Sequence, residues 1–437
     1  MLFSSGGAAL LWNPHAVRHN SSAHRIAAIV HGNGDEQQAR PALARATGEG
    51  YAAAPMTEPS SPAWQNPAFV AVRCFACDEL HDRHAPQTVC RACGLPLRVD
   101  YDHARAPLPP SALVGRPASL WRYREVVPIL PEHAVSLVEG WTPLCAVGDR
   151  LFVKDESRNP TGSFKARGLV LAVSMARVLG ARALSAPSAG NAAGALAAYG
   201  AAAKIPVVVA MPEDTPRAFV DECRHYGAEV HLCAGTIADA GRWLREHGPR
   251  DTFDVSTLKE PYRIEGKKTM AYELWEQFAG ALPDVIVYPT GGGTGLVGMW
   301  KAFGEMRALG WPMARTPRLV SVQMEGCAPV VRGFTEGAAA TVAWPDARTR
   351  VWGLRVPSPI GGFLCLRAIR ETGGTAVTVT EAEAAAATSR LAARTGLDIC
   401  PEGGATFAAF EALRAKGTIS AGETVVLFNT GTGLKYR

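Results

Sequence analysis

Residues 153–168 read VKDESRNPTGSFKARG, a turn followed by the start of a helix. The turn is indicated by three residues that favour bends, Asn159, Pro160 and Gly162. We expect the helix to open at Ser163, which holds Lys165 in its first turn. The positive end of a helix dipole and burial both disfavour an ammonium ion, so an amine there is more nucleophilic and can form an imine with a carbonyl compound. Taken alone, a lysine in this position is more often a solvated surface residue.

Around this stretch, short β-branched runs alternate with alanine-rich helical stretches. The runs that we expect to be strands are 207–210, 229–232, 285–288, 319–323 and 425–428. Strands that alternate with helices predict an α/β fold with parallel sheets covered on both faces. In such sheets, ligand-binding loops follow the carboxyl ends of strands and lead into helices.

Two further loops have this position. Residues 291–295 read GGGTG, follow the predicted strand 285–288 and precede an expected helix at Leu296. Glycines let backbone N–H groups approach an oxyanion, and the helix dipole favours its charge, although most glycine loops are only turns. Residues 188–192 read SAGNA and precede an alanine-rich helix, so they form a second candidate anion site or a plain helix cap.

Two C-x-x-C pairs lie twelve residues apart near the start of the predicted folded part. The four thiols belong to Cys74, Cys77, Cys90 and Cys93. This spacing lets four thiolates bind one zinc ion tetrahedrally, and a closed shell of protein ligands makes such a site structural. A vestigial, empty site and a nucleic-acid-binding ribbon are the alternatives, and the second lacks a basic, aromatic-rich face.

Composition excludes several classes of function. The 437 residues carry a formal charge of +5 without a dense block of lysine and arginine, so we expect no nucleic-acid partner. No apolar run reaches the roughly 18 to 20 residues that span a bilayer, so we expect no membrane segment. Scattered single cysteines beside one metal-type cluster favour a reducing compartment, and we predict a cytoplasmic protein.

The lysine stretch, together with motifs on either side of it, resembles the fold type II, tryptophan-synthase-like pyridoxal-phosphate (PLP) enzymes, and among them the threonine synthases most closely. The matching motifs are 119–123 (SLWRY), 139–144 (EGWTPL), 265–269 (EGKKT) and 430–435 (TGTGLK). The resemblance covers residues 66–437 and implies two lobes of mainly parallel sheet flanked by helices, preceded by a small zinc-ribbon-like unit. We therefore divide the chain into a tail of residues 1–65 that we predict to be disordered, a cysteine unit of 66–105 and a catalytic core of 106–437.

The resemblance also implies a cofactor site. Lys165 would carry PLP as an imine, Asn191 would bond its phenolic oxygen and Thr430 would meet its pyridine nitrogen, although Thr432 is close enough in sequence to be confused with Thr430. A hydroxyl cannot hold a charged pyridinium as a carboxylate would, which favours elimination and replacement chemistry. The remaining residues implied to bind the cofactor are Phe164, Gly291, Gly292, Gly293, Thr294 and Gly295.

For the substrate, the resemblance implies a small phosphorylated amino acid, O-phospho-L-homoserine, which would be converted with water to L-threonine and phosphate. Its carboxylate would lie on the loop at Ser188 and Ala189, and its phosphate would lie against Ser256, Thr257 and Arg263. We expect a homo-oligomer, most simply a dimer.

Two positions depart from the family pattern and leave alternatives open. Ala192 stands where many members have threonine, and Gly292 stands where some have asparagine, and both residues can help to hold the substrate phosphate in the family. The three-glycine loop is also similar to that of serine and threonine dehydratases. An ammonia-lyase, a β-replacement enzyme acting on an O-substituted serine, and an idle paralogue are therefore the other hypotheses.

Overall fold

The computed structural model describes residues 61–437. The predicted tail, residues 1–65, lies outside this range except for its last five residues, of which Gln65 forms an isolated β-bridge with Ile129. Within residues 61–437 there are three sheets, of three, six and four strands. The α/β prediction is confirmed, and each of the five runs expected to be strands lies within an observed strand.

The three-stranded antiparallel sheet carries the cysteine pairs. Its order is β2 (Leu80–His81), β1 (Phe69–Cys74) and β3 (Leu97–Tyr101). Buried side chains of this sheet, among them Phe69, Val72 and Leu97, belong to the same hydrophobic cluster as helix α1 (Lys165–Val178). The cysteine unit therefore shares its hydrophobic core with α1.

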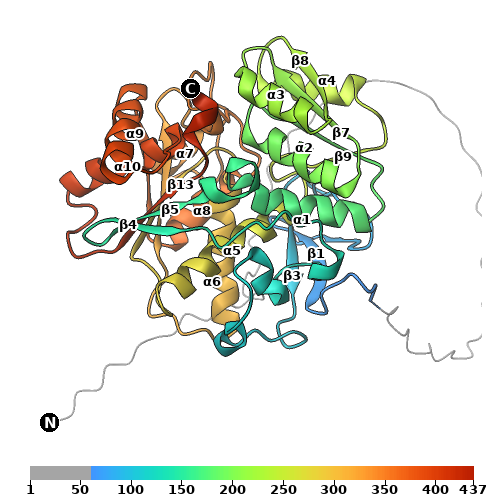
Figure 1. Cartoon of the computed structure of the whole chain (residues 1–437), viewed down its shortest axis with the longest axis horizontal. Coiled ribbons are helices and arrows are strands. Elements are labelled where there is room, and N and C mark those ends of the chain that lie inside the picture. Colours follow the sequence, from blue (N-terminus) through green and yellow to red (C-terminus); the bar gives the residue numbers. More distant parts are fainter. Residues whose placement is uncertain (1–60) are drawn as a thin grey trace, which may run out of the picture. The chain divides into compact units, whose positions relative to one another are not determined.

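The six-stranded sheet forms the centre of the larger lobe (Figure 1). All its neighbours are parallel except the edge strand β4, which is antiparallel to β5. Its order is β12 (Thr375–Val379), β11 (Arg318–Met324), β10 (Val285–Pro289), β13 (Val425–Asn429), β5 (Leu151–Asp155) and β4 (Leu144–Gly148).

Alternating side chains of these strands pack against different helices, as period-two alternation requires. Ile286 and Val426 point into a cluster with α5 (Tyr262–Gln277), α6 (Thr294–Ala308) and α8 (Gly362–Glu371). Val285 and Val425 point into a cluster with α9 (Glu381–Thr395) and α10 (Pro401–Ala415). The short helix α7 (Pro329–Thr335) follows β11. Both faces of the central strands are thus buried, which explains their continuous apolar sequence.

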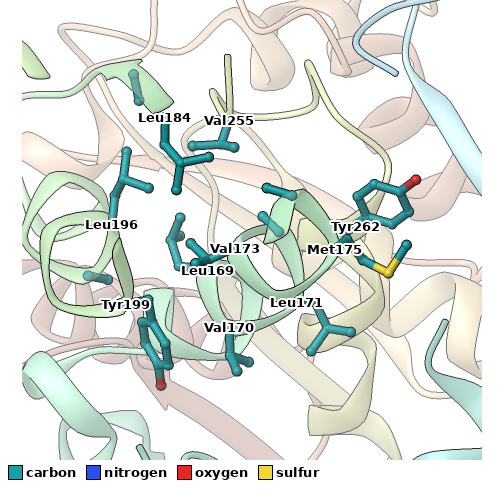
Figure 2. Packing of buried hydrophobic residues seen from close by; sticks show 14 of the residues in the cluster. Leu169, Val170, Leu171, Val173, Met175, Leu184, Leu196, Tyr199, Val255 and Tyr262 are labelled. Atoms are coloured by element: carbon teal, nitrogen blue, oxygen red, sulfur yellow. The ribbon is translucent and has the colours of Figure 1, made fainter. Parts of the chain in front are cut away.

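The smaller lobe is a wholly parallel four-stranded sheet. Its order is β8 (Glu229–Cys233), β7 (Val207–Pro212), β6 (Ala183–Pro187) and β9 (Thr252–Asp254). Figure 2 shows Leu169 and Val173 of α1 in one cluster with Leu184 of β6 and Leu196 of α2 (Asn191–Ala203). Helices α3 (Arg217–His225) and α4 (Ile237–His247) complete this lobe.

Helices α1 and α5 join the two lobes and cross at very short range. A Cβ atom on Gly266 would lie 1.7 Å from the carbonyl oxygen of Arg167, so only glycine allows this approach. Beside the crossing, the buried Arg167 guanidinium pairs with Glu156 at 2.6 Å and with Glu273 at 2.5 Å. Lys154 also pairs with Glu273, at 2.8 Å. Burial of these charges is compensated by their pairing, and the network holds α5 against β5 and α1.

None of the helices in the described part of the chain is long and apolar enough to cross a membrane.

Candidate active site

A cavity of about 680 Å³ lies where the strands of the two larger sheets end. It reaches the last residues of β6, β7 and β10, namely Pro187, Pro212 and Pro289. Every residue expected from the sequence to bind cofactor or substrate lines this cavity: Phe164, Lys165, Ser188, Ala189, Asn191, Ser256, Thr257, Arg263, Gly291, Gly292, Gly293, Thr294, Gly295 and Thr430. These residues come from five separate segments of the sequence, loops and the helix starts that follow them, and the fold gathers them around one space.

Lys165 is presented by the turn that follows β5. Asp155 begins this turn by accepting a hydrogen bond from the backbone N–H of Ser157. The expectation that the helix opens at Ser163 is wrong by two residues, since α1 begins at Lys165. Ser163 instead forms a β-bridge with Gly431, and Phe164 N donates to Thr430 O at 3.0 Å. Pairing with a segment about 270 residues away keeps Ser163 extended, and it ties the lysine to the Thr430 loop.

The surroundings of Lys165 make its amine less basic. Burial, and then the positive charge of Arg263, lower the pKa of Lys165 to about 8, and Glu402 opposes this shift. Its Nζ lies 4.5 Å from the centre of the Phe164 ring. About a tenth of the amine is therefore unprotonated at pH 7, far more than for an ordinary lysine, and this fraction can attack a carbonyl group.

The glycine loop ends at the N-terminus of α6, which begins at Thr294 and not at the expected Leu296. Gly293 has a φ of +81°, a left-handed conformation that favours glycine. The first N–H groups of a helix have no partners within the helix, so those of α6 are available to a ligand in the cavity. A Cβ atom at Gly292 would lie 2.4 Å from Thr257 Cγ2, so Thr257 occupies the space that a side chain at position 292 would need.

The second loop ends at α2, which begins at Asn191. The Asn191 amide has contacts with the C-terminal segment of the chain. Lys435 Nζ donates to Asn191 Oδ1 at 3.1 Å, and Asn191 Nδ2 donates to Tyr436 Oη at 3.5 Å. The two threonines of the last turn are in different surroundings: Thr430 lines the cavity, whereas Thr432 bonds to Asp398 and caps the terminal 3-10 helix, Gly433–Tyr436.

Arg263 lies at the start of α5 and is almost fully buried, with 2% of its surface exposed. Its Nη1 donates to the carbonyl of Val255 at 2.8 Å. Its Nε and Nη2 have no partner among residues 61–437. A buried guanidinium with two free donors at a cavity wall is typical of an anion site. Of the two hydroxyls beside it, that of Ser256 bonds to Asp254, whereas no bond of the Thr257 hydroxyl is seen in the described residues.

Comparison with known proteins decides the family. A family model for pyridoxal-phosphate dependent enzymes matches residues 135–431. The threonine synthase of Methanosarcina acetivorans is 34% identical over 373 residues, 83% of this chain and 92% of that protein. The threonine synthase of Methanocaldococcus jannaschii is 30% identical over 374 residues, again 83% of this chain and 92% of that protein. The chain belongs to the threonine synthase family of PLP-dependent enzymes. Maize serine racemase, with 21% identity and a TM-score of 0.56 over 67% of this chain and 88% of that chain, shares the fold.

The cavity of this threonine synthase family member fits a phosphate-bearing cofactor. The start of α6, with its free N–H groups, and Lys165 line one space. The cavity wall contains six cationic residues (Lys165, Arg245, Lys259, Arg263, Arg348 and Arg355) and only two carboxylates (Asp346 and Glu402). This excess of positive charge suits anionic ligands.

Sequence reasoning missed three residues that shape this cavity. Glu402, 4% exposed, accepts hydrogen bonds from Tyr436 Oη at 2.8 Å and from Gly353 N at 2.9 Å. Lys267 lies behind the glycine loop and donates to Thr294 Oγ1 at 2.5 Å. Lys267 stands in the matching motif 265–269, which was the only sequence signal for it. Nothing in the local sequence distinguishes Glu402 or Tyr436 from ordinary helix and tail residues.

The four cysteines of the N-terminal unit form a separate cluster. Their Sγ atoms lie within 4.8 Å of one another, with Cys74 and Cys93 3.4 Å apart and Cys77 and Cys90 3.6 Å apart. Such distances suit four thiolates around one tetrahedral ion. The unit is attached to the family core through Tyr101, whose hydroxyl donates to Glu265 at 2.8 Å.

Proposed function

We propose that this chain is a threonine synthase, which converts O-phospho-L-homoserine and water to L-threonine and phosphate. The observation that carries the proposal is Arg263, a buried guanidinium with two unpartnered donors on the wall of a predominantly cationic cavity. A buried guanidinium with two unsatisfied donors costs roughly 2 to 6 kcal/mol, and a bound dianion that accepted from these donors would reduce that cost. Family membership supplies the cofactor and the type of reaction.

We assign the cofactor to the residues around Lys165. Lys165 would hold PLP covalently, backbone N–H groups of residues 291–295 would bind its phosphate, and Thr430 would face its pyridine nitrogen. Asn191 Nδ2 would donate to its phenolic oxygen, and Phe164 would bound one side of its site. When bound, PLP supplies an electron sink that stabilises negative charge on the substrate carbons.

The amine of Lys165 is the group that we propose to move protons. Its lowered pKa leaves it partly neutral at physiological pH, so it can accept a proton from the α carbon and from the β carbon of the substrate. Phosphate leaves from the γ carbon, and a water molecule adds at the β carbon. The same amine, once protonated, can return a proton to a substrate carbon.

The substrate would be held at both ends. Its carboxylate would lie on the N-terminus of α2, at Ser188 and Ala189. Its phosphate would be bound by Thr257 and Arg263, with Ser256 able to contribute only if its hydroxyl is shared with Asp254. The methyl group of Thr257 fills the space beside Gly292, and its hydroxyl lies 3.8 Å from where a Cβ atom of residue 292 would be. That hydroxyl would stand in for the asparagine that some relatives have at position 292.

The test is to incubate the purified enzyme with O-phospho-L-homoserine, L-threonine and L-serine in separate reactions. Phosphate and 2-oxo acid are then measured in each reaction. We expect phosphate and threonine from the first substrate and little 2-oxo acid from the other two. Brisk formation of 2-oxo acid from threonine, with O-phospho-L-homoserine ignored, would replace this proposal by the ammonia-lyase hypothesis. Activity only on an O-substituted serine would indicate the β-replacement enzyme.

We further propose that Cys74, Cys77, Cys90 and Cys93 bind one structural zinc ion. Four thiolates complete a tetrahedral shell, so no coordination position is left for a substrate. The role of such an ion is to hold together a sheet whose middle strand, β1, has only six residues.

We also propose a cytoplasmic homodimer. The proposal rests on the family resemblance and, for the compartment, on the unpaired cysteines of the described residues. Light scattering coupled to size-exclusion chromatography would give the oligomeric state directly. A monomer at micromolar concentration would contradict it.

A further inference from the structure

Lys267 is a buried lysine without a carboxylate partner among the described residues. Its side chain is 0% exposed, and no carboxylate pairs with it among residues 61–437. The neighbouring Lys268, equally buried, pairs with Glu265 and with Glu305. Burial of an unpaired ammonium is costly. Carboxylates within the protein offset this cost for Lys268, and none does so for Lys267.

Other cations lie close to Lys267. Its Nζ lies 4.4 Å from the centre of the Phe164 ring, and Lys165 Nζ lies 4.5 Å from the same ring. Burial, followed by the charges of Lys165 and Arg263, holds the pKa of Lys267 well below its ordinary value. Three buried basic side chains therefore lie near one another, and Lys267 contacts Thr294, the first residue of α6, where the helix dipole adds further positive potential.

The hydrogen bond from Lys267 also fixes the role of the Thr294 hydroxyl. In its ammonium form Lys267 has only donors, so Thr294 Oγ1 accepts the 2.5 Å bond from Lys267 Nζ. The hydroxyl proton of Thr294 is then free, and Thr294 lines the cavity at the end of the glycine loop. A hydroxyl oriented in this way presents a donor to an anion bound at that loop.

We propose that Lys267 is a positioning residue for the cofactor phosphate. A bound dianion favours the ammonium form of Lys267. From behind the glycine loop, this ammonium neutralises part of the charge of the dianion and turns the Thr294 hydroxyl towards it. This inference depends on PLP binding in the family but not on which amino acid is the substrate. Lys267 should therefore strengthen the binding of PLP, which carries the phosphate, but not that of pyridoxal, which lacks it.

The test compares the affinity of the apoenzyme for PLP and for pyridoxal, measured by absorbance or fluorescence titration. In Lys267→Met, we expect the dissociation constant for PLP to rise on the order of 10- to 100-fold, since a buried charge-assisted contact is lost. That for pyridoxal should change by less than about threefold. Because the substitution removes an unpaired buried charge, the melting temperature of the apoenzyme should not fall.

Two further variants test the contact between Lys267 and Thr294. Thr294→Val should also weaken PLP more than pyridoxal, and the double variant should be no weaker than the worse single variant, because both act on one contact. Lys268→Met is the matched control, and it should lose stability while keeping the wild-type ratio of PLP to pyridoxal affinity. If Lys267→Met does not fold, Lys267→Gln, which keeps a donor, takes its place with the same expected direction.

The outcomes separate this inference from the proposed function. A wild-type ratio of affinities in Lys267→Met, or an equal loss for both ligands, would overturn the role of Lys267 and leave the proposed function intact. A wild-type protein that binds neither ligand would overturn the cofactor assignment itself.

Discussion

Lys435, the third residue from the end of the sequence, donates from Nζ to Oδ1 of Asn191 at 3.1 Å. The same ammonium pairs with the carboxylate of Glu222 at 2.7 Å, and both side chains are mostly buried. Lys435 binds the amide oxygen and Tyr436 Oη accepts one of the two amide N–H groups at 3.5 Å, so the second N–H of Asn191 is left to face a ligand. The C-terminal segment thus orients a residue of the smaller lobe.

We therefore predict that Lys435→Met lowers kcat about tenfold and shifts the visible absorption maximum of the bound cofactor. The substitution removes one charge-assisted hydrogen bond to Asn191 and leaves Glu222 unpaired. Together these two effects cost about 1 to 2 kcal/mol. Steady-state kinetics and absorption spectra measure both effects. Lys435→Arg should recover most of the wild-type spectrum, and an unchanged spectrum in Lys435→Met would show that the amide needs no such support.

Lys165→Ala should abolish turnover and the visible absorbance of bound cofactor. Its amine alone among the described lysines lies on the cavity wall with a pKa lowered to about 8. Since a pKa below the ordinary 10.5 means that the neutral amine prevails at lower pH, recombination of wild-type apoenzyme with PLP should accelerate as pH rises through about 8 and then level off. Lys416→Ala, at an exposed lysine, is the control. Undiminished turnover of Lys165→Ala would remove the assignment.

Arg263→Leu should cost about 2 to 4 kcal/mol in kcat/KM for O-phospho-L-homoserine, because the two free guanidinium donors would be lost from the phosphate site. Cofactor absorbance and slow deamination of unphosphorylated serine should scarcely change. The control is Arg367→Leu, which removes the charge of an exposed arginine paired with Glu371. It should leave kcat/KM for O-phospho-L-homoserine unchanged. Equal use of O-phospho-L-homoserine by Arg263→Leu and wild type would exclude Arg263 from the phosphate site.

Metal analysis of protein prepared without chelator should give about one zinc ion per chain, bound by the four clustered thiolates. Cys90→Ser should remove the ion and lower the thermal midpoint, because Cys74 and Cys90 lie in the same hydrophobic cluster as α1. Cys145→Ser, outside the cluster, should change neither value. Metal-free wild-type protein, or a Cys90→Ser variant with unchanged zinc content, would show that the four clustered cysteines do not bind zinc.

Local sequence patterns predicted what depends on neighbouring residues. The strands 285–288 and 425–428 were recognisable because burial on both faces requires continuous apolar runs. The start of α1 was not predictable, because Ser163 is kept extended by Gly431, far along the chain. Lys267 and Glu402 were missed for a similar reason. Their importance comes from contacts with Thr294 and Tyr436, and periodicity carries no information about such distant partners.

The crossing of α1 and α5 at Gly168 and Gly266 has a kinetic consequence. These helices are about 100 residues apart in sequence, and the entire four-stranded lobe is contained in the loop between them. Bringing the two ends of so long a segment together carries an entropic cost that no short-range contact offsets, and such non-local steps are slow. The native contacts at this crossing should therefore form last during refolding. They should follow the folding of the enclosed lobe, which shortens the chain segment that separates the two helices.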